Sequence, residues 1–597
     1  MFTRLRNRVL TVVGPDIPAL PSSGGSSGGS SGVAHHGGRD DHGGKGNLPE
    51  KFRYARPQFL QLLTYDELKA SADHNVRPII VPRDLSLLPW NTGYAECVNS
   101  GKSEWNEDQA AFHRQVLSHP SKQYQDLPYT YFGIYDGHAG YGAALAASNQ
   151  FHHILHEKLV DIIDLLMPRV EGNGPASSGV GVGLNAILPH PILFHKQVSK
   201  DELIVGALEA AFADMDALLA EDRDKYRNAG GCTALVALFI LGKLFVANAG
   251  DSRGVLCKRI SKQKLPNIRP PSVHEESLNG ELATEEEVDD GYVVYAEPCS
   301  FDHTPETERP RLLSVGKLNP NLMGGEYVAM EYAKKPMTKD LGTRILYRQG
   351  TMKGWTYKTL TRSDLKMPIV TGEGKRSRLL GTIGVTRGFG DHDLKALGSG
   401  LPIKPFLSCH PDVICVDLSA IESDPDADNC DFEYGVLVLA TDGLWDVTYS
   451  QKVANTVFTT LKKFPTERHR YTMAAQELVA KSRGRANING HWRLSDSRAA
   501  ATVDDISVIV IPVYQYYLEY LEWKRSLQRR KLSSEVIAGS TNAGVGSTGV
   551  QQTSEEHRSS SSDSDLLEVD SVFQDPLPMS GVVAATSDDT ILDAVTK

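Results

Sequence analysis

Several aspartates of this sequence occur where short apolar runs begin or end. A strand that leaves a packed core and stops at Asp-Gly presents a carboxylate at a rigid edge, because glycine permits the turn that follows. Several such carboxylates in one place would repel one another unless a cation lay among them, and Mg²⁺ and Mn²⁺ prefer oxygen ligands. The pattern therefore predicts a site for two divalent ions. Its expected members are Asp136-Gly137 after Tyr129–Tyr135, Asp442 after Gly435–Ala440, and Asp504 before Ile506–Val513.

An ordinary hairpin turn is the competing interpretation of each Asp-Gly pair. For any single pair the turn is the better interpretation, because Asp-Gly is a common turn sequence. Two further acidic motifs favour a shared site: one is Asn106-Glu107-Asp108, and the other, NAGDSR, contains Asp251. The acidic motifs taken together are harder to explain as turns.

Composition narrows the class of protein. The chain has 597 residues, and its 63 Lys plus Arg against 74 Asp plus Glu give a formal net charge of −11, which argues against a general nucleic-acid-binding protein. The seven cysteines have no CxxC spacing, which fits a reducing intracellular compartment and disfavours a thiolate zinc site. The longest apolar runs, Ala234–Leu241 and Val436–Ala440, are far shorter than the roughly 20 residues that cross a bilayer.

Strand-like and helix-like segments occur in mixed order, which predicts an α+β domain over residues 49–532. The runs Thr233–Leu241 and Leu244–Ala249 meet at Gly242-Lys243, a hairpin pattern. Exposed loops are expected at 172–191 and 262–290, whereas the insertion 316–378 contains Trp355 and Tyr357 and is expected to fold. Helical patterns cover Gly142–Asp164, Leu203–Asp222, Met473–Ser482 and Tyr514–Leu532.

Both ends of the chain are expected to lie outside this domain. Residues 1–48 comprise a basic segment, Met1–Val13, and a Gly/Ser-rich tether, Pro21–Gly46. As a helix, residues 1–13 would be amphipathic and would support weak peripheral membrane association, while a frayed terminus and a mitochondrial presequence are alternatives. Residues 533–597 are Ser/Thr-rich and are expected to be disordered, either as a phosphorylated tail or as a plain solvating one.

Nine motifs between about Trp90 and Val513 occur in an order that resembles the metal-dependent protein phosphatases of type 2C. One short motif would be weak, but nine in order are specific. Details such as GWTYKT at 354–359 are similar to the H/J/M subgroup of that family. The motifs are NED (106–108), DGHAG (136–140), GGCTA (230–234), NAGDSR (248–253), HTPETERPRL (303–312), GVTRGFGD (384–391), KPFLSCHPDV (404–413), ATDGLWDV (440–447) and DDISVIVI (504–511).

The resemblance implies a fold and a set of metal ligands. The fold would be a two-sheet antiparallel β-sandwich flanked by α-helices, with the metals at one end and the insertion 316–378 as a flap beside the active site. Asp136 would bridge two Mg²⁺ or Mn²⁺ ions and the carbonyl of Gly137 would bind one of them. The remaining ligands implied are Asp442 and Asp504 for the other ion, Glu107 and Asp108 for metal-bound water, and Asp251 and Asp446 for a third, weaker ion.

The chemistry implied is hydrolysis of phosphoserine and phosphothreonine by metal-activated water, with Asp136, Asp442 and His138 as catalytic residues. No covalent phosphoenzyme is needed, and no cysteine is followed by Arg six residues later as in the Cys-x5-Arg loop of cysteine phosphatases. His138 would protonate the departing Ser or Thr oxygen. A pseudophosphatase that uses the fold only to bind proteins is the alternative, although Asp136, Asp442 and Asp504 are all present.

The sequence departs from the family at the position of a phosphate-binding arginine, where it has Ser103. Lys102 is adjacent but, on a strand, would point elsewhere. Phosphate binding would then rest on the metals, on Lys102 through a backbone shift, or on a basic residue of the insertion, where Lys375, Arg376 and Arg378 cluster. By default such a cluster is solvated surface. The subgroup resemblance further implies phosphothreonine on Rab-type small GTPases as substrate, in the cytoplasm and at endomembranes such as the Golgi.

Overall fold

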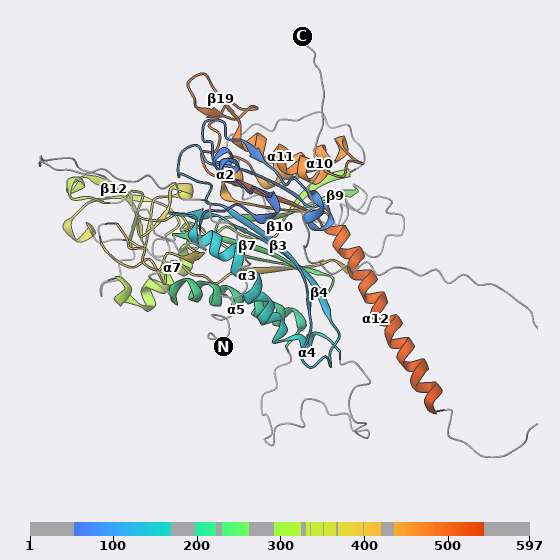
Figure 1. Cartoon of the computed structure of the whole chain (residues 1–597). Coiled ribbons are helices and arrows are strands. Elements are labelled where there is room, and N and C mark those ends of the chain that lie inside the picture. Colours follow the sequence, from blue (N-terminus) through green and yellow to red (C-terminus); the bar gives the residue numbers. More distant parts are fainter. Residues whose placement is uncertain are drawn as a thin grey trace, which may run out of the picture. The chain divides into compact units, whose positions relative to one another are not determined.

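The sequence folds into helices and mainly antiparallel sheets, which we describe from a computed structural model (Figure 1). The chain divides into two compact units, Met1–Ser534 and Glu535–Lys597, and all elements below belong to the first unit except the end of helix α12. Our expectations for 1–48, 172–191, 262–290 and the tail beyond 542 lie outside the described residues. The structure describes residues 53–168, 198–221, 230–261, 292–323, 330–334, 336–349, 352–365, 368–397, 399–419 and 435–542.

Two antiparallel sheets form the centre of the first unit. One has the strand order β1-β2-β21-β18-β9-β10 and the other has the order β17-β8-β7-β4-β3. The six strands of the first sheet are β1 (Ile79–Ile80), β2 (Gly93–Cys97), β9 (Arg253–Ser261), β10 (Tyr292–Pro298), β18 (Val436–Ala440) and β21 (Ile506–Pro512). The five strands of the second sheet are β3 (Gln109–Leu117), β4 (Leu127–Tyr135), β7 (Ala234–Ile240), β8 (Lys243–Ala249) and β17 (Asp412–Asp417).

Helices cover the outer face of each sheet (Figure 1). Helices α3 (Gly142–Val160) and α5 (Lys200–Glu221) pack on the five-stranded sheet, and α10 (Ser450–Lys463) and α11 (Arg470–Arg483) pack on the six-stranded sheet. The expected α+β fold, a two-sheet β-sandwich flanked by helices, is therefore confirmed. The other helices are α2 (Tyr65–Ser71), α4 (Ile163–Leu166), α7 (Arg309–Leu318), α9 (Asp442–Trp445) and α12 (Val513–Asn542).

The central strands are apolar on both faces because each face meets a different layer. In β7, Leu235 and Phe239 pack in the core between the two sheets, together with Leu439 of β18. Val236 and Leu238 point the other way and pack beneath α3 and α5. A strand buried on both faces reads as a continuous apolar run, which is why the sequence located β7 and β18 but not the face that each residue occupies.

The sequence predicted the β7–β8 hairpin, but its turn lies one residue earlier than expected, at Leu241-Gly242 and not at Gly242-Lys243. Leu241 and Gly242 both have positive φ, 53° and 76°, as a two-residue type I′ turn requires.

Helix α12 departs from expectation, because it continues to Asn542 rather than ending near Leu532. Residues 533–542 contain no proline that would break the helix, although most of them, including Gly539, are weak helix formers. Within the described ranges, every helix is too short or too polar to cross a bilayer.

Two small sheets extend the sandwich. A three-stranded sheet joins β5 (Gly137–His138), β6 (Gly231–Cys232) and β16 (Phe389–Gly390), so it brings three of the sequence motifs together. The insertion forms a sheet of its own, and its role as a flap stays a prediction. That sheet has the order β13 (Thr356–Thr359), β12 (Arg344–Gln349), β11 (Met330–Tyr332), β14 (Val370–Thr371) and β15 (Arg378–Leu379), and a separate hairpin pairs β19 (Arg485–Ala486) with β20 (Trp492–Arg493).

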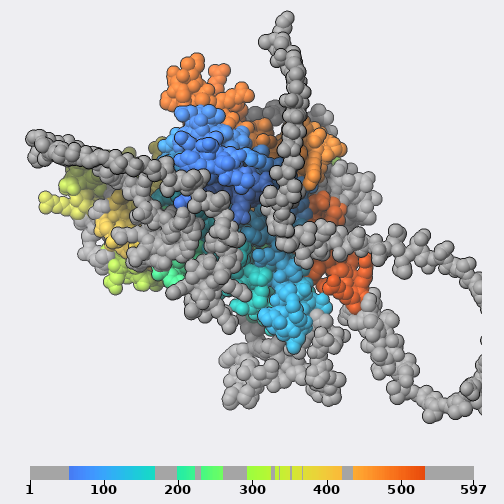
Figure 2. Space-filling model, in the orientation of Figure 1, coloured from blue at the N-terminus to red at the C-terminus, as the bar shows by residue number. Residues whose placement is uncertain are grey.

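The early and late parts of the first unit are neighbours. Strand β2 pairs with β21 in a register that sets Cys97 opposite Ile506. In the space-filling view the blue residues of the early part adjoin the orange residues of the late part (Figure 2). This pairing brings the loop after β2 close to Asp504 and Asp505, which precede β21.

Two histidines stack in the layer between β3 and α3. The ring centroids of His113 and His152 are 3.5 Å apart and the rings are nearly parallel, at 13°. Burial lowers the pKa of His113 to about 4 and the pKa of His152 to about 2, and neighbouring histidines lower both further. Both rings are therefore neutral in the folded protein at pH values where the unfolded chain binds protons.

We expect this pair to make the fold sensitive to acid. Because both folded-state pKa values lie below the unfolded value of about 6.5, stability is lost as the pH falls below 6.5, by roughly 2 kcal/mol for each histidine between pH 8 and pH 5. Urea unfolding at several pH values measures this loss. A His113→Gln/His152→Gln protein should lose less stability over that range, and exposed His491→Gln is the control. An equal loss in the double variant would contradict the prediction.

Candidate active site

Three aspartates from different strands meet at one end of the sandwich. Asp136 follows β4, Asp251 lies just after β8, and Asp442 follows β18 and begins α9. One carboxylate oxygen from each can be chosen so that all three lie within 4.8 Å of one another. Strands from both sheets therefore end at the same place, because β4 and β8 belong to one sheet and β18 to the other.

These carboxylates stand in an unfavourable electrostatic environment. Burial, followed by the charges of Asp442 and Asp108, raises the pKa of Asp136 well above its usual range. Burial and Asp251 do the same to the pKa of Asp442, and burial raises the pKa of Asp251 to about 7. A divalent cation removes this repulsion, and a donor set made only of carboxylate oxygen fits a hard ion such as Mg²⁺ or Mn²⁺.

Asp504 lies beside this group and forms an ion pair with Lys102. Burial lowers the pKa of Lys102, but Asp504, Asp442 and Asp136 outweigh burial, so the net shift is upward. Our expectation that Lys102 points elsewhere is wrong, because residues 98–108 form a loop and not a strand. The side-chain oxygen of Asn99 accepts hydrogen bonds from the backbone N–H groups of residues 101, 102 and 103, which turns the loop toward the carboxylates.

Ser103, at the family's arginine position, has a structural role. Its hydroxyl donates to the carbonyl of Trp105 at 2.6 Å and accepts from the amide of Asn99 at 2.8 Å. Ser103 is thus used to hold the loop. Lys102 is the cation that this loop offers to the site.

The NED motif lies next to the group of three aspartates. Asp108 accepts a hydrogen bond from the Thr441 hydroxyl at 2.9 Å, and burial raises its pKa well above the usual range. Glu107 accepts from the backbone N–H of Gly140 at 2.8 Å, and burial raises its pKa to about 7. Asp505 accepts from the backbone N–H groups of Asn99 and Glu107, so its carboxylate holds the loop.

The remaining expected ligands lie at the edges of the site. Gly137 is in β5, between Asp136 and His138. Asp446 is half exposed, and the amine of Lys375 donates to its carbonyl at 2.8 Å and to its carboxylate at 3.2 Å. Of the three basic residues noted in the insertion, Lys375 thus contacts an expected ligand, whereas Arg378 donates to backbone carbonyls of its own loop.

His138 has a carboxylate partner that the sequence analysis did not identify. Its Nε2 lies 2.7 Å from a carboxylate oxygen of Asp391. Burial lowers the pKa of His138, but Asp391 outweighs burial and the net shift is upward. Gly231 leaves room for this pair, since a Cβ there would lie 2.2 Å from Asp391 and 2.6 Å from His138. Gly231 lies in the GGCTA motif, Asp391 in GVTRGFGD and His138 in DGHAG. A motif does not indicate which side chains meet.

Two buried arginines hold the segments that carry the carboxylates. Arg56 donates to the carbonyls of Asn106 and Asp108 and forms an ion pair with Glu96. Arg77 donates to the carbonyl of Asp504 at 2.8 Å and to other carbonyls of the same region. Both were missed, because a single arginine in an N-terminal segment has no sequence pattern that reveals a buried role.

Comparisons with known proteins were made on sequence and on structure. A family model described as Protein phosphatase 2C matches residues 185–277 and 369–489. The chain is 39% identical to "Protein phosphatase 1H" of Xenopus tropicalis and of Homo sapiens over 565 residues, which covers 86% of this chain and 99% of each relative. It is 41% identical to "Protein phosphatase 1J" of Rattus norvegicus over 476 residues, 77% of this chain and 86% of that one.

A solved structure, "Crystal structure of serine-threonine phosphatase 2C from Toxoplasma gondii", covers 67% of this chain and 94% of its own, with 16% identity and a TM-score of 0.31. That likeness is too weak to carry an argument. The sequence relatives span most of the chain, and the family model covers the segments that carry Asp251 and Asp442.

We expect divalent ions and a single amide substitution to have opposite effects on stability. Asp442→Asn removes repulsion, so without ions and with a chelator it should melt at a higher temperature than the parent protein. Mn²⁺ at 100 times its Kd should stabilise the parent by about 2.7 kcal/mol per site, and the variant by less. Thermal melts measure both effects, with exposed Asp66→Asn as the control. An equal Mn²⁺ shift in Asp442→Asn would count against the site.

Proposed function

Because the chain belongs to the protein phosphatase 2C family, we propose that its acidic centre binds Mg²⁺ or Mn²⁺ and hydrolyses phosphoserine and phosphothreonine in proteins. The observation that carries the proposal is the convergence of Asp136, Asp251 and Asp442. Bound ions would lower the pKa of a water molecule and offset charge on the phosphoryl oxygens. The family resemblance supports two ions in the site and a third that binds more weakly.

The residues around the centre have separate roles in this proposal. Asp136, Asp442 and Asp504 bind the central ions, with the carbonyl of Gly137, while Asp251 and Asp446 bind the weaker one. Glu107 and Asp108 orient water on the ions through their carboxylates. The raised pKa values of Asp136, Asp442 and Asp251, which burial causes first and neighbouring carboxylates increase, support the assignment, because a cation favours the ionised form of all three.

Lys102 binds the phosphoryl group in place of an arginine. Its amine is on the same side as Asp504 and Asp442, so it can pair with a phosphoryl oxygen next to the ions. An ammonium is a point charge and lacks the bidentate geometry of a guanidinium, so Lys102 neutralises the phosphoryl group more than it orients it.

His138 gives a proton to the departing oxygen of serine or threonine. Asp391 holds the imidazole by one nitrogen, at 2.7 Å, and leaves the other nitrogen for the substrate. The carboxylate thus acts as a positioning group for the general acid. Because leaving alkoxides are strong bases, a proton donor at this position lowers the barrier to bond cleavage.

The finer substrate proposal rests on likeness alone. We propose phosphothreonine on Rab-type small GTPases as the substrate, in the cytoplasm and at endomembranes such as the Golgi, with residues 1–13 as a weak membrane anchor. The likeness to the H/J/M subgroup supports this proposal.

The activity itself is tested with the full chain and a phosphothreonine peptide. We expect phosphate release that needs Mn²⁺ or Mg²⁺ and stops with a chelator. Asp442→Asn should lower kcat by at least 100-fold, because one carboxylate fewer holds the ions. Exposed Asp66→Asn is the control. Release that persists without divalent ions would overturn the proposal, and a folded, metal-binding protein with no release would favour the pseudophosphatase.

The role of Lys102 is tested separately. Lys102→Ala should raise KM for the phosphopeptide by roughly ten- to a hundredfold, since a charge-assisted contact is lost, while Lys102→Arg should keep most of the activity. Steady-state kinetics at saturating Mn²⁺ measure both, with exposed Lys69→Ala as the control. If Lys102 only neutralises Asp504, the alanine variant will bind Mn²⁺ more tightly and leave KM unchanged.

A further inference from the structure

The HTPETERPRL motif received no role in the sequence analysis, yet its first residue contacts the loop that carries Asp251. The Nδ1 atom of His303 accepts a hydrogen bond from the backbone N–H of Gly250 at 3.1 Å. The backbone N–H of His303 donates in return to the carbonyl of Gly250 at 2.8 Å. One residue thus binds both polar backbone groups of the residue that precedes Asp251.

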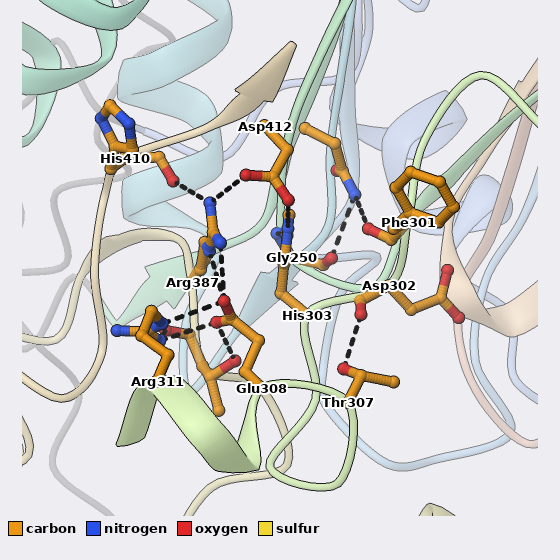
Figure 3. Close-up of polar contacts among 12 residues, drawn as sticks. Gly250, Phe301, Asp302, His303, Thr307, Glu308, Arg311, Arg387, His410 and Asp412 are labelled. Carbon is orange, nitrogen blue, oxygen red and sulfur yellow. Dashed lines mark hydrogen bonds and ion pairs between the residues drawn. The ribbon is translucent and has the colours of Figure 1, made fainter. Parts of the chain in front are cut away.

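The imidazole of His303 is itself fixed from the other side (Figure 3). Its Nε2 lies 2.9 Å from a carboxylate oxygen of Asp412, the first residue of β17. The other oxygen of Asp412 accepts from Arg387 at 2.8 Å. Arg387 also binds Glu308, in the same motif as His303, at 2.6 Å. The His303 ring is only 2% exposed, whereas the Asp412 side chain is 47% exposed.

These partners determine which ring nitrogen carries the hydrogen. A backbone N–H can only donate, so Nδ1 of His303 must be the acceptor. Nε2 therefore carries the hydrogen and donates it to Asp412, whose charge Arg387 balances. The ring is held in one tautomer and one orientation, as is common for groups that orient a metal ligand.

The backbone at Gly250 needs such support because its conformation is restricted. Its φ is 142°, and a Cβ there would lie 2.3 Å from the side chain of Thr233. The amide of Asn248 also donates to the Gly250 carbonyl, at 3.1 Å, and to the carbonyl of Phe301. The turn into Asp251 is thus held at Gly250. Its backbone N–H donates to His303, and its carbonyl accepts from His303 and Asn248.

We propose that His303, fixed by Asp412, is a positioning residue that sets the place of Asp251 relative to Asp136 and Asp442. The inference rests on the proposed binding of divalent ions at that centre. Asp251 does not contact His303 in the described hydrogen bonds, so the effect passes through the peptide unit of Gly250. Substitution of a group that orients a metal ligand in this way commonly lowers metal affinity ten- to a hundredfold.

The test compares side chains that keep different parts of the contact. In His303→Asn the amide oxygen replaces Nδ1 and can still accept from Gly250, whereas in His303→Gln the longer amide reaches Asp412 and not Gly250. We expect Mn²⁺ affinity, measured on the full chain from the electron paramagnetic resonance signal of free Mn²⁺, to fall ten- to a hundredfold in His303→Ala and His303→Gln. The asparagine variant should stay within about threefold of the parent.

The controls separate positioning from folding. His410→Ala removes a nearby histidine whose carbonyl, and not its ring, binds Arg387 (Figure 3), so it should leave Mn²⁺ affinity unchanged. Should the substitutions at His303 prevent folding, Asp412→Ala is the second variant, because that side chain is 47% exposed and its loss should still lower the affinity about tenfold. A merely structural role would make affinity follow the melting temperature across all the variants.

The failure of this inference can be told from failure of the proposed function. If Asp251→Asn weakens Mn²⁺ binding but His303→Ala and Asp412→Ala do not, the positioning role is overturned and the metal centre stands. If Asp251→Asn also leaves Mn²⁺ binding unchanged, the assignment of Asp251 in the metal centre is wrong, and the positioning role falls with it.

Discussion

Repulsion among carboxylates is the constraint on which the rest of this structure depends. Asp136, Asp251 and Asp442 offer oxygens within 4.8 Å of one another, and further acids stand close by. Left alone, such groups would separate or take up protons, because burial first and neighbouring carboxylates second raise their pKa values. The protein must therefore hold the strand ends rigidly, and the proposed cation would supply the missing charge.

The sandwich provides that rigidity from both of its sheets. Because β4, β8 and β18 are buried on both faces, their ends cannot move apart without disturbing the core between the sheets and the cores beneath the helices. Arginines at the sides of the site add a second restraint, since Arg56 and Arg77 bind backbone carbonyls of the loops that carry Asp108 and Asp504. A buried guanidinium suits this task because its five donors point in fixed directions.

Charged side chains surround the centre, some in contact with its acids and others farther away. Lys102 is next to Asp504, Lys375 reaches Asp446 from the inserted sheet, and Asp391 keeps His138 in place. Farther out, Arg387 balances Asp412 and Glu308, and its network ends at the peptide unit of Gly250. Each of these groups either neutralises one acid or fixes the backbone of another, so the centre stays ordered despite its charge.

The sequence by itself determined the strands, the hairpin at Gly242 and the acids at the strand ends, because apolar runs and Asp-Gly turns are local patterns. Family resemblance added the sandwich and the ligand set. Only the tertiary structure decided that Lys102 turns toward Asp504, that Asp391 meets His138 and that His303 binds Gly250. These contacts join residues far apart in the chain through loops, and the direction of a loop side chain depends on neighbours that no local pattern specifies.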